Sequence, residues 1–231
     1  MKSYQRYWTA SITILLAMTL SGCGLAYPAE YLPAGSPTPS RCFMATGHTV
    51  GGNFWRYFEA MGGVQSLGYP ITEPFMQEGR QVQYFEYARL EDHPDNPGRP
   101  VVKLSLLGER LGRRQPPLSP ARVPPASDRN SRYFPQAGHA LSGDFLTYFE
   151  EYGGLNRFGF PIAEPLVRGG KLVQDFQRAR LVWNLDRPPG NRVTLEPSGR
   201  FYFEAQGLDL ALMAPVPCPP GSQVVQPHAS N

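Results

Sequence analysis

Aromatic residues recur with helical spacing in two places along this chain. In both places the rings and one further apolar residue stand at i, i+3, i+4 and i+7, the spacing of a stripe on one face of a short helix. The two stripes are Phe54, Tyr57, Phe58 and Met61, and Phe145, Tyr148, Phe149 and Tyr152. The pattern predicts helices over residues 53–61 and 144–152, each ended by the Gly-Gly pair that follows it.

Extended patterns follow each predicted helix. The phrase Gly-Tyr-Pro-Ile-Thr-Glu-Pro begins at Gly68, and each proline disfavours helix at the residue before it, so the phrase predicts a stiff extended connector. Turn residues then precede strands predicted over 81–90 and 172–183, which form hairpins with the short apolar segments before them. Residues 101–111 and 192–202 are each expected to add a strand. The predicted fold class is α+β.

The two patterned regions are copies of each other. A shift of 91 positions aligns residues 43–104 with residues 134–195 without a gap, and 26 of the 62 aligned positions are identical. We call these two segments the first copy and the second copy. Each copy reads as a short aromatic helix, an extended Gly-x-Pro-Ile-x-Glu-Pro connector and a β-hairpin, so the chain is expected to hold two tandem repeats of a small α+β unit.

In each copy, the strand that follows the connector carries polar residues. One repeated face holds Val82, Ala88 and Leu90, and the other holds Gln83, Phe85 and Arg89. A buried arginine is tolerated when it is paired and hydrogen-bonded. The extended Glu73 is the predicted partner of Arg89, and Glu164 is the predicted partner of Arg180.

The first 23 residues resemble the export signal of a bacterial lipoprotein. Lys2 and Arg6 precede an apolar run that is too short to span a bilayer, and the run ends in the lipobox-like tetrad Leu-Ser-Gly-Cys. This predicts that residues 1–22 are removed and that Cys23 is lipidated. An ordinary signal peptide with an incidental cysteine is the alternative.

Lipidation at Cys23 would place the mature protein on the outer side of a cell membrane, anchored through its acyl chains. Cys42 and Cys218 then remain as an even pair in a compartment where disulfides persist, and they are predicted to bridge; two unrelated buried thiols are the alternative. Loss of residues 1–22 lowers the formal net charge from +3 to +1, which argues against nucleic acid as the partner.

Composition divides the mature chain into segments. Proline is frequent in two stretches that have no apolar periodicity, and these are predicted to be a tether and a linker. The expected division is residues 1–22 signal peptide, 23–41 proline-rich tether, 42–112 first repeat, 113–132 linker rich in proline and arginine, 133–218 second repeat, and 219–231 disordered tail.

Part of each copy resembles the LGFP repeat of bacterial cell-wall proteins. The similarity lies in Leu-Gly-Tyr-Pro at 67–70, in Phe-Gly-Phe-Pro at 158–161 and in the Val-Gln-x-Phe that follows each of them. Such repeats are regarded as wall-associating modules without chemistry of their own. The resemblance therefore implies anchoring or binding of wall glycan.

Reaction machinery is hard to find in the sequence. Common motifs for metal hydrolysis, serine nucleophiles and phosphate loops are missing, so no catalytic residue, metal or cofactor is predicted. His48 and His139 are expected to have structural roles. The repeated acids, Glu59 with Glu150 and Glu73 with Glu164, could form a glycosidase pair, but duplicated positions offer similar environments, whereas such a pair needs different ones.

Three aromatic side chains at positions that differ between the copies are candidate ligand contacts: Trp55, Tyr84 and Tyr87. The sequence thus favours a lipid-anchored, non-catalytic binding or scaffolding module at the cell envelope, with wall glycan as the ligand. A protein partner at the cell surface is the alternative, and a cryptic hydrolase is the third hypothesis.

Overall fold

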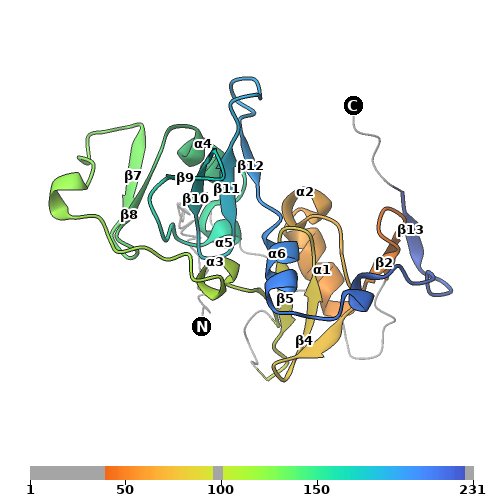
Figure 1. The fold of residues 1–231 in the computed structure, drawn as a ribbon. Coiled ribbons are helices and arrows are strands. Elements are labelled where there is room, and N and C mark those ends of the chain that lie inside the picture. Colours follow the sequence, from red (N-terminus) through yellow and green to blue (C-terminus); the bar gives the residue numbers. More distant parts are fainter. Residues whose placement is uncertain (1–39, 96–100, 227–231) are drawn as a thin grey trace, which may run out of the picture. The chain divides into compact units, whose positions relative to one another are not determined.

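The computed structural model describes residues 40–95 and 101–226 (Figure 1). The predicted signal peptide, Cys23 and most of the predicted tether lie outside the described residues. Within them the protein has mixed α+β structure, as the sequence predicted, with short helices and several small sheets. No helix among these residues is both long and apolar enough to cross a bilayer.

In both copies a helix precedes an antiparallel hairpin, and corresponding elements lie 91 residues apart. The first set is β1 (Arg41–Phe43), β2 (His48–Val50), α1 (Gly52–Ala60), α2 (Gly63–Leu67), β3 (Phe75–Gln77), β4 (Arg80–Tyr84), β5 (Arg89–Asp92), β6 (Val102–Leu104) and α3 (Leu107–Arg110). After the 3-10 helix η1 (Pro120–Arg122), the second set is β7 (Ser131–Phe134), β8 (His139–Ser142), α4 (Gly143–Glu151), α5 (Gly154–Phe158), β9 (Leu166–Arg168), β10 (Lys171–Asp175), β11 (Arg180–Trp183), β12 (Val193–Leu195) and α6 (Ser198–Ala205). The last described elements are η2 (Leu210–Met213) and β13 (Gln223–Val225).

Each copy forms one four-stranded antiparallel sheet in sequence order, β3-β4-β5-β6 in the first and β9-β10-β11-β12 in the second. Val82 on β4 lies opposite Phe75 on β3 and Glu91 on β5. The second sheet keeps the same register 91 residues later. Because the connector phrase also bridges to the sheet, at Pro70 with Phe85, it lies along the sheet as extended chain.

The predicted aromatic helices are present as α1 and α4, each beginning one residue earlier than expected. Their buried stripes include Phe58 and Phe149, which stack on the strand residues Phe85 and Phe176 with ring centroids 5.2 and 5.6 Å apart. Gly62 ends α1 in the left-handed region, with φ +92°. The next glycine opens a further helix of five residues, which is too short to show a periodic signal.

The segment after each sheet differs from the prediction. Strand was expected across 101–111 and 192–202, but only β6 and β12 are strands, and the helices α3 and α6 follow them. We call residues 105–118 the first arm and residues 196–218 the second arm. Each arm forms backbone hydrogen bonds with the copy that it does not follow in the sequence.

Hydrogen bonds at corresponding positions hold the two arms. The amide of Gly108 in α3 donates to the carbonyl of Gln177 in the second copy, at 2.9 Å. The amide of Gly199 in α6 donates to the carbonyl of Glu86 in the first copy, at 3.0 Å. Both donors and both acceptors are 91 residues apart, so the copies exchange their arms reciprocally.

Further along, each arm is fixed to the Gly-His pair of the other copy. The amide of Leu118 donates to the carbonyl of Gly138, and the amide of Val216 donates to the carbonyl of Gly47, both at 2.9 Å. The predicted linker is therefore not only a spacer, because its first part is hydrogen-bonded to the second copy.

The second arm completes an apolar cluster against the first copy. Its α6 contributes Tyr202 and Phe203, whose rings meet Tyr84 of β4 with centroid distances of 6.3 and 5.2 Å. The buried members of this cluster are Ile71, Val82, Tyr84, Leu107, Tyr202 and Phe203. Both faces of the first sheet are thus covered, one by α1 and the other by the second arm.

The structure contains the predicted disulfide between Cys42 and Cys218, which are 176 positions apart in the sequence. The predicted disordered tail is wrong in part, because Gln223–Val225 forms β13 and pairs in parallel with β1. The disulfide holds the chain five residues before this strand, so the short pairing is formed by a tethered segment.

Candidate functional site

Arg89 is the largest fully buried side chain among the described residues. Its guanidinium donates to Oε1 of Gln77 (3.1 Å), Oγ of Ser105 (2.9 Å) and Oε1 of Glu91 (2.5 Å). The predicted partner Glu73 is thus replaced by Glu91. The physical reason is that residues two apart on a strand share one face of the sheet, and Glu91 follows Arg89 by two.

Arg180 also takes partners other than the predicted Glu164. It donates to both carboxylate oxygens of the buried Asp175, at 2.7 and 3.0 Å, and to Glu196 at 3.2 Å. Arg113 of the first arm joins this network through Glu196, at 2.7 Å. The repeated arginines are therefore buried and paired as predicted, but their acids come from positions that the copies do not share.

Glu73 holds the start of β2. Its Oε1 accepts the amide of Thr49 at 2.7 Å and lies 3.4 Å from Nδ1 of the buried His48. The other ring nitrogen of His48 lies 3.3 Å from the carbonyl oxygen of Met213 in the second arm. This histidine is therefore surrounded by protein groups on both sides of its ring.

Glu164 has the same place in the second copy. Its Oε1 accepts the amide of Ala140 and lies against Nδ1 of His139, both at 3.1 Å. The repeated Gly-His and Pro-Ile-x-Glu motifs thus join at the same strand, next to the carbonyl that receives the exchanged arm. No group of three metal-ligating side chains occurs within the described ranges 40–95 and 101–226.

The three candidate ligand-facing rings have different surroundings. Trp55 is half-buried, with the Arg41 guanidinium 4.8 Å above its ring. Tyr84 is fully buried, which contradicts a ligand-facing role; its hydroxyl donates to Gln77, and burial raises the pKa of this phenol to about 12. Tyr87 is half-buried. Only Trp55 and Tyr87 keep the exposure that a ligand contact needs.

Arg157 ties the two copies together. Its guanidinium is buried and donates to three backbone carbonyls, those of Tyr152 (3.2 Å), Gln65 (3.2 Å) and Ser66 (2.8 Å). Gln65 and Ser66 belong to the first copy and Tyr152 to the second. Burial lowers the pKa of Arg157, although the nearby Tyr148, Tyr152 and Tyr87 act in the opposite direction.

A hollow of about 550 Å³ lies between β6, α3 and a side chain of the second copy. We call it the charged hollow. Its lining is Tyr57, Glu91, His93, Val102, Lys103, Leu104, Ser105, Leu106, Glu109, Arg110 and Arg178. Since both copies and the first arm contribute to it, this hollow depends on the exchange of arms.

Both acids of the charged hollow are already paired. Glu91 binds Arg89 and His93, and Glu109 binds Arg114. Burial raises the pKa of Glu91, but its hydrogen bond with Ser105 and the charge of Arg89 outweigh this, and the net pKa is lowered. Glu91 is therefore an ionised, hydrogen-bonded acceptor at neutral pH.

Cationic groups remain for a ligand. Lys103 and Arg178 form no ion pair with any residue in the described part of the chain; the guanidinium of Arg178 donates to the carbonyl of Leu155, at 2.9 Å. Burial lowers the pKa of the Arg178 guanidinium, although the nearby Tyr57 acts in the opposite direction. An anionic group entering the hollow would meet these two cations.

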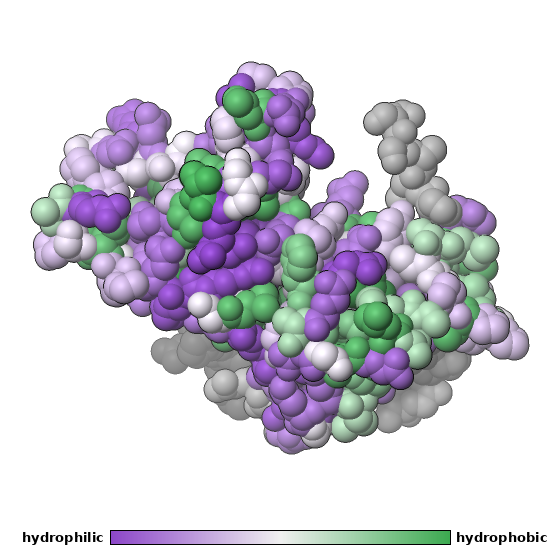
Figure 2. Space-filling view, viewed as in Figure 1, coloured by the Kyte–Doolittle hydropathy of each residue, from purple (hydrophilic) through white to green (hydrophobic). Residues whose placement is uncertain are grey.

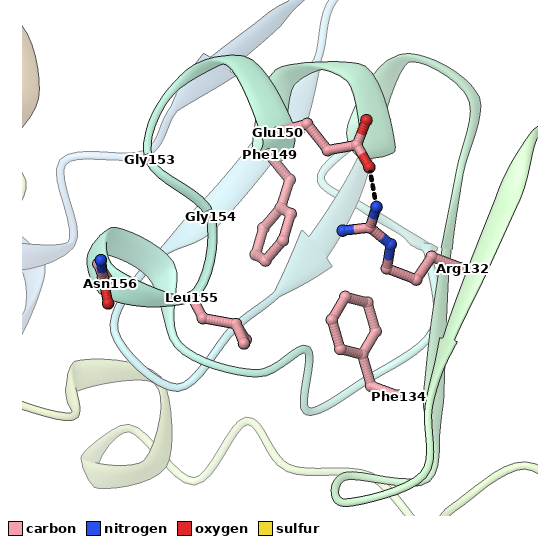
Figure 3. Close-up of a pocket in the computed structure, with 8 residues that line it drawn as sticks. All are labelled: Arg132, Phe134, Phe149, Glu150, Gly153, Gly154, Leu155 and Asn156. Carbon is pink, nitrogen blue, oxygen red and sulfur yellow. Dashed lines mark ion pairs between the residues drawn. The ribbon is translucent and has the colours of Figure 1, made fainter. Parts of the chain in front are cut away.

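A second hollow, also of about 550 Å³, lies in the second copy and is open to solvent (Figure 3). We call it the ring hollow. Phe134 and Phe149 line it and contact each other edge to face, with ring centroids 5.7 Å apart. Arg132 and Glu150 form an ion pair beside them, with N and O 2.5 Å apart. The other lining residues are Gly153, Gly154, Leu155 and Asn156.

The face drawn in Figure 2 is largely hydrophilic, and its apolar side chains form separate patches. Exposed apolar residues of the second arm include Phe201, Leu210 and Leu212. Comparison with known proteins adds no assignment to these surfaces, since no protein-family model matches the chain and no curated protein matches it.

Proposed function

We propose that the protein is a lipid-anchored, extracytoplasmic lipoprotein of the bacterial envelope that binds wall glycan without catalysing a reaction on it. In this proposal two tandem repeats form one binding unit, and the charged hollow receives acidic groups of the glycan. The observation that carries it is the pair of cations, Lys103 and Arg178, set in a hollow that both copies line.

The tandem architecture is supported by the 91-residue spacing of the helices and strands and by the reciprocal arm contacts. A non-catalytic role is supported by the use made of the duplicated polar residues. Glu73 and Glu164 each accept a backbone amide and lie against a histidine, and His48 also contacts the second arm. The duplicated arginines are buried in ion pairs. These groups stabilise the fold.

Binding of an acidic glycan should depend on Lys103. The variant Lys103→Glu is expected to weaken co-sedimentation of residues 24–231 with purified peptidoglycan or envelope polysaccharide roughly tenfold or more, because it replaces a charged donor with a repelling acid. Added salt should weaken binding of the wild type as well. The apparent affinity is measured by titrating the glycan and assaying the unbound protein.

Lys171→Glu is the matched control, since Lys171 is exposed at the start of β10 and its replacement makes the same charge change. Equal loss in the two variants would place binding outside the charged hollow. Failure of the wild type to sediment with a range of wall preparations would contradict glycan binding itself.

Anchoring should depend on Cys23 alone. Cells given labelled palmitate are expected to incorporate it into the wild-type protein and into a Cys42→Ser/Cys218→Ser variant, but not into Cys23→Ala, because the acyl chains are attached at Cys23. The label is measured on the purified protein after electrophoresis. Label retained in Cys23→Ala would show that the lipid, if any, is carried elsewhere.

A further inference from the structure

The two short hairpins that open the copies differ in their number of strands. In the first copy β1 lies between β2 and β13, so it has a strand on each side. In the second copy β7 pairs with β8 alone within the described residues. The outer edge of β7 therefore corresponds to an edge that is occupied in the first copy.

The occupied edge shows what this kind of site accepts. Gln223 lies beside Arg41 and Val225 lies beside Phe43, in parallel register. The amide of Gln223 also donates to the carbonyl of Ser40, at 3.1 Å. The side chain of Val225 packs against the first core. The bound strand therefore presents a polar residue and, two positions later, an aliphatic one to the same face.

The ring hollow is the counterpart of the space that Val225 covers. Phe134 of the hollow stands 91 residues after Phe43, and Phe149 stands 91 residues after Phe58, which meets Phe43 edge to face at 5.6 Å. In the second core, the partly buried apolar residues all come from 137–195, and no added strand contributes. Leu155 at its rim is 42% exposed.

We propose that β7 and the ring hollow bind an extended segment of another protein, which adds as a parallel strand of the Gln-x-Val type. Its polar side chain would lie beside Arg132 and its aliphatic side chain would lie over Phe134 and Phe149. Main-chain hydrogen bonds then give affinity, and the hollow gives side-chain selectivity, as in strand addition generally.

The donor is a different protein. β13 is held on β1 by the disulfide five residues before it, so this chain's own Gln-Val-Val segment is already used. In another molecule of this protein the same segment is likewise paired with β1. This surface is separate from the charged hollow, so the inference does not depend on glycan binding.

The first copy also suggests how the affinity can be raised. The amide of Met44 donates to the carbonyl of Val225 at 3.2 Å, whereas the corresponding position in the second copy is Pro135, which has no amide proton. Pro135→Met should restore that donor. One added hydrogen bond corresponds to roughly three- to tenfold tighter binding.

The test uses the isotope-labelled chain without its lipidated cysteine, residues 24–231, and a synthetic peptide that copies residues 221–226. Saturable binding with shifts at the amides of Tyr133 and Phe134 is expected by NMR. Leu155→Glu should weaken binding at least tenfold, because it places a charge in the apolar hollow, and Pro135→Met should tighten it. Val167→Glu, at a 70% exposed position on β9, should bind as the wild type does.

Three results would overturn the proposal. Shifts at Cys42 and Phe43 would mean that the peptide replaces β13 on the first copy. Equal binding by a peptide whose second valine is replaced by aspartate would remove the role of the hollow. Concentration-dependent self-association that Leu155→Glu abolishes would identify a second copy of the chain as the occupant.

Discussion

A Gly199→Ala variant is expected to lose about 3–5 kcal/mol of unfolding free energy. A Cβ at this position would lie 2.0 Å from the carbonyl oxygen of Phe85 and 2.6 Å from that of Ala88, and both belong to the backbone of the turn between β4 and β5. To relieve this clash α6 must withdraw, which uncovers Tyr202 and Phe203. The measurement is urea unfolding followed by tryptophan fluorescence.

Gly108→Ala should have a similar effect, since its Cβ would lie 1.9 Å from the carbonyl oxygen of Phe176. Gly51→Ala is the control: its nearest neighbour is the Cβ of Ser40 at 3.3 Å, and serine already stands at the corresponding position 142. An unfolding midpoint of Gly199→Ala equal to that of Gly51→Ala would contradict the seating of α6 on the first copy.

Replacing both bridged cysteines by serine is expected to lower the unfolding free energy by about 2–5 kcal/mol. The bridge between Cys42 and Cys218 closes a loop with a sequence separation of 176. Such a bridge lowers the conformational entropy of the unfolded chain, and for so long a loop the expected stabilisation is near the upper end of that range. Thermal and urea unfolding of the double variant give the change.

Reductant supplies an internal control for this prediction. It should destabilise the wild type by the same amount and leave the Cys42→Ser/Cys218→Ser variant unaffected. If the double variant unfolds at the wild-type midpoint, the bridge adds nothing to the stability of the folded state, and the second arm is held by its hydrogen bonds and packing alone.

Local patterns predicted the local elements. The spacing of Phe54 and Phe58 gave α1, and the proline phrase gave an extended connector that the bridge at Pro70 fixes to the sheet. The arms were not predictable in the same way. α3 has four residues, and its Gly108 hydrogen-bonds to the other copy, so no periodicity within 107–110 reports its partner.

The partners of the buried arginines show a second limit. The sequence predicts that Arg89 pairs with Glu73, because both residues recur in the second copy. The acids that bind the arginines stand at unshared positions, Glu91 in one copy and Asp175 in the other. The duplicated arginines both need an acidic partner, but the acid stands at a different position in each copy.

The charged hollow could not be predicted from the sequence for the same reason. Lys103 and Arg178 line the charged hollow from positions where the other copy carries a different residue, and they are 75 residues apart in the sequence, so nothing brings them together before the arms are placed. The sequence predicts Tyr84 as a ligand contact because the residue at this position differs between the copies. The difference arises because Tyr84 meets α6 whereas Asp175 meets Arg180.

The reciprocal arms also bear on how such a chain can arise. A polypeptide with one copy would carry an arm without the copy to which that arm hydrogen-bonds. The arm-binding surface of its own copy would also be uncovered. Two such polypeptides would satisfy each other as protomers of a domain-swapped homodimer. In a single chain the same association is intramolecular, so the seating of the arms does not vary with protein concentration.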